Sequence, residues 1–228
     1  GRQPMRVKND TNQYIIAFNG EIYNARSLRN ELQRRGWSFE SVSDTEVLLK
    51  AYIEWGADHL EHLNGIFSYA IWDEAKEQLF LARDRLGVKP LFYSLYQDGI
   101  LIGSEIKAIL AHDDIKAKID SEGLTELFAV GPSKSPGSAV FSGISELRAA
   151  HFAIFNKNGL VTRRYWNVKS EEHVDGVEET AEKVRHLLIR AVESQLGADV
   201  PVGTFLSGGV DSSAISSIVN TYRKANNL

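Results

Sequence analysis

The sequence predicts an α+β domain over its first 165 residues, followed by the start of an α/β domain. In the first part, short apolar runs alternate with turn residues, which predicts antiparallel hairpins, and amphipathic helices lie between them. After residue 170 a long amphipathic helix, an apolar run, a pair of glycines and another helix follow one another. This change of pattern predicts two domains, over residues 1–168 and 176–228.

The first domain is predicted to open with a strand and a helix. Residues 13–18 form a β-rich run that stops at Asn19-Gly20. Apolar residues with helical spacing follow over 25–35. Gly36 comes directly after this run and suits the end of a helix, because glycine tolerates the left-handed backbone found there.

A second helix is predicted over 44–55, where Ser43 and Glu46 have the spacing of a capping box. Beyond it, the same periodicities predict further strands and short helices. The strands are expected at 66–72, 78–82, 91–96, 100–103, 152–155 and 160–165, and the helices at 105–111 and 121–130. A charged, turn-rich stretch over 167–176 is expected to link the domains, and a long amphipathic helix covers 176–196.

The composition excludes several classes of protein. The chain has 228 residues, of which 43% are apolar and 25% charged, and its formal net charge is −4. These values are typical of a globular protein and give no basic surface for nucleic acid. No apolar run approaches the roughly 20 residues of a membrane span, and no signal peptide is visible, so we expect a cytoplasmic protein without membrane partners. The absence of cysteine excludes disulfides, and His59 and His62 lack a third ligand, so we interpret both as packing or surface residues.

Seven residues near the end of the chain, Ser207-Gly208-Gly209-Val210-Asp211-Ser212-Ser213, predict a site for the pyrophosphate end of ATP. The apolar run 200–206 predicts a strand before them, and 214–219 suits a helix after them. Backbone N–H groups at such a helix start favour an anion, and glycines let it approach closely. Asp211 would repel phosphate unless a divalent cation lay between them, which indicates Mg²⁺. The alternative is a polar turn in which Asp211 or Ser212 caps the helix.

The string Ala17-Phe18-Asn19-Gly20-Glu21-Ile22-Tyr23-Asn24 is the second informative feature. Asn-Gly after a strand is a common hairpin turn, which is one interpretation. The following residues lead into a helix, however, and this favours an oxyanion hole formed by the Asn19 carboxamide and the Gly20 N–H. Glu21 beside that hole, and Asp44 at the next helix start, could each hold a substrate ammonium group. The alternative for Asp44 is a role at the helix start alone.

These two strings resemble those of the glutamine-hydrolysing asparagine synthetases, and other strings follow in that family's order. They are Ser43-Asp44-Thr45-Glu46, Gly65-Ile66-Phe67, residues 82–91 and residues 103–108. The resemblance covers nearly the whole chain. It implies that residues 1–168 are a class II glutamine amidotransferase (glutaminase) domain, an αββα sandwich of the N-terminal-nucleophile type. It implies that 176–228 begin an α/β synthetase domain of the ATP-pyrophosphatase type, of which the first βα unit is present.

The resemblance also implies the reaction and the residues that serve it. Such enzymes hydrolyse glutamine to ammonia, adenylylate aspartate with ATP and Mg²⁺, and form asparagine with release of AMP and pyrophosphate. Asn19 and Gly20 would form the oxyanion hole, and Asn19, Gly20, Glu21 and Asp44 would bind glutamine. The residues that would bind ATP are Leu206, Ser207, Gly208, Gly209, Asp211, Ser212 and Ser213, with Mg²⁺ at Asp211.

The chain departs from the family pattern in two ways. The family's nucleophile is an N-terminal cysteine, which this chain lacks, so we expect it upstream and expect this fragment alone to be inactive. Residues 147–151 lack the family's prolines, which puts the local turn in question. Two alternatives stay open: a related amide- or lactam-forming synthetase that acts on another carboxylate, and a noncatalytic domain that inherited the fold. The sequence also leaves a homodimer open.

Overall fold

The computed structural model describes residues 2–8, 12–131, 135–197 and 201–226. Contacts between Cα atoms divide the chain into two units, Gly1–Val168 and Lys169–Leu228. All strands that the structure describes belong to the first unit, whereas the second holds the helices α6 (Val177–Ser194) and α7 (Val210–Asn226).

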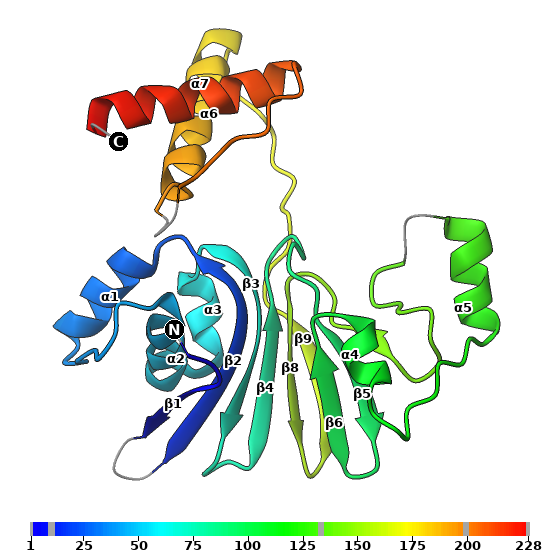
Figure 1. The fold of residues 1–228 in the computed structure, drawn as a ribbon. Coiled ribbons are helices and arrows are strands. Elements are labelled where there is room, and N and C mark those ends of the chain that lie inside the picture. The colour runs from blue at the N-terminus through cyan, green and yellow to red at the C-terminus, as the bar shows by residue number, and fades with distance from the viewer. Residues whose placement is uncertain (1, 9–11, 132–134, 198–200, 227–228) are drawn as a thin grey trace. The chain divides into compact units, whose positions relative to one another are not determined.

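Within the described residues, the strands of the first unit form two sheets (Figure 1). The larger sheet has the order β1-β2-β3-β4-β8-β9 and the smaller sheet has the order β6-β5-β7. All these neighbours pair antiparallel, as the hairpin pattern predicts. The strands are β1 (Met5–Lys8), β2 (Gln13–Ile22), β3 (Gly65–Asp73), β4 (Gln78–Arg83), β5 (Phe92–Tyr96), β6 (Gly99–Gly103), β7 (Ser145–Glu146), β8 (His151–Asn156) and β9 (Gly159–Arg164).

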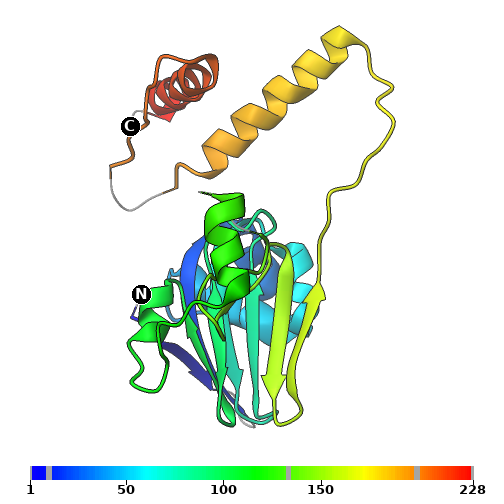
Figure 2. The same ribbon diagram turned by 90° about the vertical axis from the view of Figure 1, so that its right-hand side faces the viewer.

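Most helices of the first unit lie on the outer sides of the two sheets (Figures 1 and 2). Three of them pack on the larger sheet and one packs on the smaller sheet. The helical segments are α1 (Ala25–Arg34), α2 (Asp44–Trp55), the 3₁₀ turn Gly56–Asp58, α3 (His59–His62), α4 (Ile106–Leu110), α5 (Ser121–Thr125) and the π-helical turn Glu126–Val130. The last two replace the single helix predicted over 121–130.

Three clusters of buried apolar side chains hold these layers together. The first joins α1, α2 and α3 to the larger sheet and includes Leu48 and Phe67. The second lies between the two sheets and includes Leu81 and Leu91. The third joins α4 to the smaller sheet and includes Ile109. The result is an αββα sandwich, which confirms the predicted α+β class.

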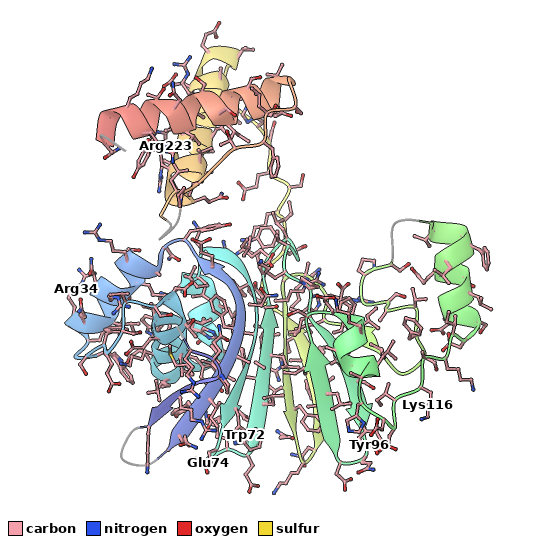
Figure 3. The ribbon with its side chains drawn as sticks, viewed as in Figure 1. Arg34, Trp72, Glu74, Tyr96, Lys116 and Arg223 are labelled. Carbon is pink, nitrogen blue, oxygen red and sulfur yellow. The ribbon has the colours of Figure 1, made fainter. Side chains whose placement is uncertain are left out.

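The hairpin turns mark one end of the sandwich. Glu74 in the β3–β4 turn and Tyr96 at the β5–β6 turn lie at this end (Figure 3). β2 begins beside the β3–β4 turn, where Tyr14 pairs with Asp73, so its last residues, 19–22, lie at the other end of the sandwich. The predicted glutamine-binding residues therefore lie away from the hairpin turns.

The strand predicted over 13–18 is longer than expected. β2 continues through Asn19 and Gly20 to Ile22 and pairs with β3 from Tyr14 onward. The prediction that the strand stops at Asn19 is therefore wrong, and so is the hairpin-turn alternative. Pairing with β3 overrides the local turn preference, because sheet contacts decide what an isolated dipeptide does not. The sequence pattern also does not predict β1, which is short and polar.

The first two helices lie where their patterns predict. α1 ends one residue before the predicted limit, and Gly36 has the positive φ of +98° that suits the end of a helix. α2 has the predicted bounds. Ser43 caps it by accepting a hydrogen bond from the Thr45 N–H at 3.2 Å.

Glu46 does not complete the predicted capping box, because its carboxylate has other partners. It accepts hydrogen bonds from the backbone N–H groups of Glu40 at 2.9 Å and Ser41 at 2.7 Å. It also pairs with Lys50, whose ammonium lies 2.5 Å away and is buried with it. Burial opposes ionisation, but the bonds from Lys50 and Ser41 prevail and lower the pKa of Glu46 to about 2. The pair holds the loop that precedes α2.

In the second unit, α6 forms one continuous helix close to the predicted range 176–196 (Figure 2). Residues 201–206 lie in no strand, so the strand predicted over 200–206 is wrong for these residues, and Val200 lies outside the described residues. A strand needs a neighbour to pair its N–H and C=O groups, and the described part of this unit offers none. None of the helices described, in either unit, is long and apolar enough to cross a membrane.

Ala150 adopts a left-handed backbone with a φ of +59°, in the segment that departs from the family pattern. Its N–H donates to the Asp84 carbonyl and its carbonyl accepts from the Tyr165 N–H, both at 2.9 Å. We expect Ala150→Gly to leave the free energy of unfolding within about 0.5 kcal/mol of that of the unmodified chain. The left-handed conformation costs alanine about 1–2 kcal/mol, and glycine relieves it. Glycine adds about 0.5–1 kcal/mol of chain entropy to the unfolded state, and loss of the buried methyl group costs about 0.8 kcal/mol.

Urea unfolding followed by circular dichroism measures this small change. Ala153→Gly is the matched control, because Ala153 is a buried alanine of β8 that has no positive φ. We expect Ala153→Gly to lower the stability. The strain argument fails if Ala150→Gly lowers the stability by a similar amount.

Candidate functional site

On both sides of Gly20, side chains form hydrogen bonds with the backbone groups at the outer edge of β2. The pairing of β1 with β2 ends at Ile16, and beyond this point the side chain of Gln3 bonds to the backbone of β2 as a neighbouring strand would. Its carbonyl oxygen accepts from the Phe18 N–H at 2.6 Å, and its amide N–H donates to the Phe18 carbonyl at 2.8 Å. Two residues after Gly20, the Ile22 N–H donates to the carboxylate of Asp44 at 3.2 Å.

The N–H of Gly20 points to the same edge. Alternate N–H groups of a strand point in the same direction, so Gly20 follows Phe18 and Ile22. The bonds of its cross-strand neighbour Phe67 support this direction. The Phe67 N–H and carbonyl both bond to Asp84, at 3.2 Å and 2.8 Å, on the side of β3 that faces away from β2, so neither bonds to Gly20. The Gly20 N–H therefore points away from β3, between two N–H groups that already have partners.

Only glycine fits at position 20. Its φ is +154°, and a Cβ there would lie 2.2 Å from the carbonyl oxygen of Ile66 and 2.7 Å from the Cα of Phe67. Gly65 is constrained in the same way, since its Cβ would lie 2.2 Å from the carbonyl oxygen of Glu21. β2 and β3 approach more closely here than side chains allow. The short distance between the two strands explains why position 20 is glycine, whether or not Gly20 also binds a substrate.

The side chain of Asn19 lines a cavity of about 210 Å³ between the two sheets. Its amide nitrogen donates to the hydroxyl of Ser104 at 3.0 Å. A carboxamide nitrogen carries two hydrogens, so one N–H remains for a ligand. Other residues that line the cavity are Ala17, Ser68, Ala70, Leu91 and Ile102.

Glu21 follows on the same strand, with an exposed side chain. Its charge acts on Tyr23, whose pKa is raised by burial first and then by the carboxylates of Glu21 and Asp84. Two carboxylates therefore lie near Tyr23 at this end of β2, and a carboxylate is a suitable partner for a bound ammonium group.

Asp44 begins α2 and reaches β2 through its bond to the Ile22 N–H. Because Ser43 accepts the capping hydrogen bond, Asp44 is not the cap of α2. The structure thus brings the four residues predicted to bind glutamine together at the C-terminal end of β2. They are Asn19, Gly20, Glu21 and Asp44. Their binding roles stay predictions.

The loop after β4 supports this end of the sandwich. The carboxylate of Asp84 accepts from the backbone N–H groups of Val88 and Lys89, both at 2.9 Å, in addition to Phe67. The neighbouring Arg83 is buried and pairs with Glu146 at 3.0 Å. These buried charges hold the loop in one conformation, because a buried carboxylate that loses its donors is costly.

The predicted pyrophosphate loop folds back on itself. The Ser207 N–H donates to the hydroxyl oxygen of Ser212 at 3.3 Å, and the two hydroxyl oxygens lie 3.0 Å apart. Gly208 turns the chain with a φ of +84°. α7 begins at Val210, so its first turn lies within the predicted loop, and the N–H groups of this turn have no partners within the helix.

The loop has room for an anion beside its backbone. A Cβ at Gly208 would meet nothing within 4 Å, and one at Gly209 would meet only the Ser207 hydroxyl, at 3.8 Å. Asp211 lies exposed in the first turn of α7. Over the described ranges no group of three or more His, Cys, Asp or Glu side chains could hold a metal ion. Mg²⁺ at Asp211 would therefore need phosphate oxygens among its ligands.

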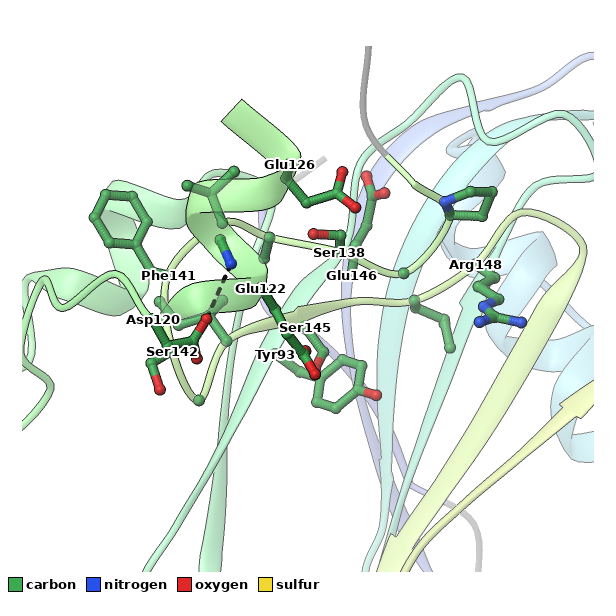
Figure 4. Close-up of a pocket in the computed structure, with 18 of the residues that line it drawn as sticks. Tyr93, Asp120, Glu122, Glu126, Ser138, Phe141, Ser142, Ser145, Glu146 and Arg148 are labelled. Carbon is green, nitrogen blue, oxygen red and sulfur yellow. Dashed lines mark hydrogen bonds between the residues drawn. The ribbon is translucent and has the colours of Figure 1, made fainter. Parts of the chain in front are cut away.

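A larger cavity of about 580 Å³ lies apart from the predicted residues (Figure 4). It lies between α5, with the π-helical turn that follows, and the chain around β7, and several carboxylates line it. These carboxylates serve the local structure. Asp120 accepts from the Gly123 N–H at 2.9 Å and caps α5, and Glu126 accepts from the Ser135 N–H at 2.8 Å. We assign this cavity no ligand.

Sequence reasoning does not find three residues that shape the site. They are Gln3, Gly65 and Ser104, which contact Phe18, β2 and Asn19 respectively. Two of these contacts join residues 15 and 85 positions apart in the chain. The only signal in the sequence is that Gly65 and Ser104 lie within strings that resemble the family.

Solved structures share the fold of this chain. Glutamine phosphoribosylpyrophosphate amidotransferase from B. subtilis, complexed with ADP and GMP, matches 99% of the chain and 47% of its own, with a TM-score of 0.52 and 19% identity. A structure described as the allosteric regulatory enzyme of purine biosynthesis matches 98% of the chain and 45% of its own, with a TM-score of 0.52 and 22% identity. The αββα sandwich is thus the class II glutamine amidotransferase fold.

The chain belongs to the glutamine amidotransferase domain family, whose model matches residues 1–166. The asparagine synthase family matches residues 183–227. The chain is 57% identical over 218 residues to asparagine synthetase [glutamine-hydrolyzing] 3 of Bacillus subtilis (strain 168), and 34% identical over 225 residues to asparagine synthetase [glutamine-hydrolyzing] 1 of the same strain.

These two alignments cover 96% and 97% of this chain but 36% and 35% of the relatives. The chain therefore spans about a third of the length of the curated relatives that it matches. The resemblance to the glutamine-hydrolysing asparagine synthetases is confirmed.

Proposed function

We propose that the chain supplies the glutaminase domain and the start of the synthetase domain of a glutamine-dependent asparagine synthetase. Residues 1–168 would form the first and residues 176–228 begin the second. One observation carries the proposal. The Gly20 N–H points to the open edge of β2 between satisfied neighbours, and the Asn19 carboxamide beside it keeps one N–H for a ligand. Two adjacent donors are what a developing oxyanion requires.

Glutamine would place its side-chain amide at these two donors. As attack turns the carbonyl oxygen into an oxyanion, the bonds from Asn19 and Gly20 would strengthen, which lowers the barrier and leaves ground-state binding almost unchanged. The carboxylates of Glu21 and Asp44 would hold the α-ammonium group. The attacking thiolate would come from the family's cysteine, which is not among the residues of this chain.

The second unit would hold the pyrophosphate of ATP. Backbone N–H groups and hydroxyls of residues 207–213 would bind its oxygens, and Asp211 would hold Mg²⁺ together with them. Leu206 would contact the nucleotide through its backbone. ATP would transfer its AMP group to the side-chain carboxylate of aspartate with release of pyrophosphate, and ammonia would then displace AMP to give asparagine. The match of residues 183–227 to the asparagine synthase family supports this assignment.

The test uses the protein as its gene encodes it. We expect this protein to release glutamate from glutamine, and we expect Asn19→Ala to lower kcat by about 10²–10³ with little change in KM, because the lost bond forms mainly in the transition state. A coupled glutamate assay gives both constants. Formation of AMP that depends on aspartate, rather than on another carboxylate, tests the synthetase half in the same samples.

Asn30→Ala is the matched control, because Asn30 is an exposed asparagine on α1 outside the site. It should leave both constants unchanged. An encoded protein that releases no glutamate would refute the glutaminase assignment. An Asn19→Ala variant with the rate of the unmodified protein would refute the oxyanion role of Asn19.

A further inference from the structure

Ser104 joins the smaller sheet to the predicted oxyanion hole. It follows the last residue of β6, and its hydroxyl oxygen accepts the hydrogen bond from the Asn19 amide at 3.0 Å. The two residues lie 85 positions apart, Asn19 on the larger sheet and Ser104 directly after a strand of the smaller sheet. Both line the cavity of about 210 Å³ between the sheets.

The position of Ser104 is defined from both sides. On one side, Gly103 pairs with Phe92 of β5. On the other side, α4 begins two residues later, at Ile106, and is anchored by the buried side chain of Ile109. A hydroxyl held between a paired strand and a packed helix can fix the direction of a partner more precisely than one on a long loop can.

Asn19 needs such a partner. Its side chain is exposed, and the torsion that turns its carboxamide has broad energy wells, so water alone would leave the amide free to rotate. A rotated amide would present its oxygen, which repels an oxyanion, or would point its N–H elsewhere. The bond to Ser104 uses one of the two N–H groups and thereby aims the other.

We propose that Ser104 is a positioning residue, which holds the Asn19 carboxamide in the orientation that donates to the oxyanion. This inference rests on the proposed glutaminase function. Ser104 does not contact the reacting atoms and acts only through Asn19. The packing of the smaller sheet against the larger one thereby becomes part of the geometry of the site.

The encoded protein provides the test. We expect Ser104→Ala to lower kcat for glutamate release about tenfold, the usual worth of one orienting hydrogen bond, with KM changed less than about twofold. Ser104→Thr keeps the hydroxyl and should restore most of the rate. The double variant Asn19→Ala/Ser104→Ala should be no slower than Asn19→Ala alone, because Ser104 has nothing left to position.

A second measurement is independent of turnover. The amide C–N bond keeps the two side-chain N–H groups of Asn19 distinct in NMR spectra. In this chain, the N–H bonded to Ser104 should exchange its hydrogen with water more slowly than the other, and Ser104→Ala should speed that exchange. Ser27→Ala is the control, because Ser27 is an exposed serine on α1 whose hydroxyl donates to a backbone carbonyl at 3.0 Å. It should change neither the hydrogen exchange of Asn19 nor the rates.

The possible outcomes separate the two proposals. If the unmodified protein releases no glutamate, the glutaminase function fails, whatever Ser104 does. If it is active and Ser104→Ala matches it in kcat, or the double variant is slower than Asn19→Ala by the full effect of Ser104→Ala, the positioning role is wrong and the glutaminase function stands. Unchanged hydrogen exchange of Asn19 in Ser104→Ala would also overturn the positioning role.

Discussion

Replacing Gly20 with alanine is expected to lower the free energy of unfolding of the first unit by about 4 kcal/mol, or to leave it unfolded. The added Cβ would lie 2.2 Å from the carbonyl oxygen of Ile66 and 2.7 Å from the Cα of Phe67. Both obstacles are backbone atoms of β3, so no side chain can turn away. A backbone strain of about 1–3 kcal/mol at the φ of +154° adds to an overpacking cost of similar size.

Urea unfolding of Gly20→Ala, followed by circular dichroism, measures this loss. Gly36→Ala separates strain from overlap, because Gly36 also has a positive φ, +98°, but its Cβ would meet nothing within 4 Å. We expect Gly36→Ala to cost only about 1–2 kcal/mol. Equal losses for the two variants would show that β3 moves aside and that the close approach is not a constraint.

The steric requirement for glycine at position 20 limits what Gly20 can show about function. A glycine that the fold itself requires is not evidence for an oxyanion hole, and loss of activity in Gly20→Ala would follow from loss of the fold alone. The functional argument therefore depends on the direction of the Gly20 N–H and on Asn19, which no steric constraint explains. Asn19 and Ser104 are the positions at which chemistry can be tested without disturbing the packing of β2 on β3.

The helices could be predicted from the sequence because their signals are local. α2 has the predicted bounds, since Ser43 and the apolar periodicity after it act within one or two turns. The Asn19-Gly20 turn signal is equally local, and here it misleads. It competes with the pairing of β2 and β3, whose partner residues lie more than forty positions later in the chain.

The same distinction applies to the candidate site. The residues predicted to bind glutamine lie near one another in the sequence or follow a helix start, so their types and spacing could identify them. The contacts of Gln3 and Ser104 depend on how two sheets and a chain end come together, which no local pattern encodes. The prediction of a strand fails over residues 201–206 for a related reason, since an apolar run forms a strand only where another strand is available to pair with it.

The second large effect is expected from pH. His59 is fully buried, with Nδ1 2.5 Å from the Gly56 carbonyl and Nε2 2.5 Å from the Tyr69 hydroxyl. A carbonyl only accepts, so Nδ1 carries the hydrogen, and Nε2 of the neutral ring accepts from Tyr69. Burial lowers the pKa of His59 to about 3 from its usual 6.5, because the imidazolium would lose its hydration.

A group whose pKa is lower in the folded state binds its proton more readily when unfolded, so acid favours unfolding. The contribution of His59 is complete above pH 6.5 and falls away toward pH 3, by about 5 kcal/mol in all at about 1.4 kcal/mol per unit. Glu46, with a folded pKa of about 2, adds a loss of the same sign only below its usual 4.5. Between pH 6.5 and 4.5 we therefore assign about 3 kcal/mol to His59.

Urea unfolding at half-unit steps of pH checks this window, and His59→Gln isolates it. Glutamine cannot titrate, so the variant should be less stable at pH 7 but should lose about 3 kcal/mol less than the unmodified chain between pH 6.5 and 4.5. If His59→Gln instead loses as much stability as the unmodified chain over this window, the buried histidine binds its proton as readily in the folded state as in the unfolded state, and its ring must then donate to Tyr69 as well as to Gly56.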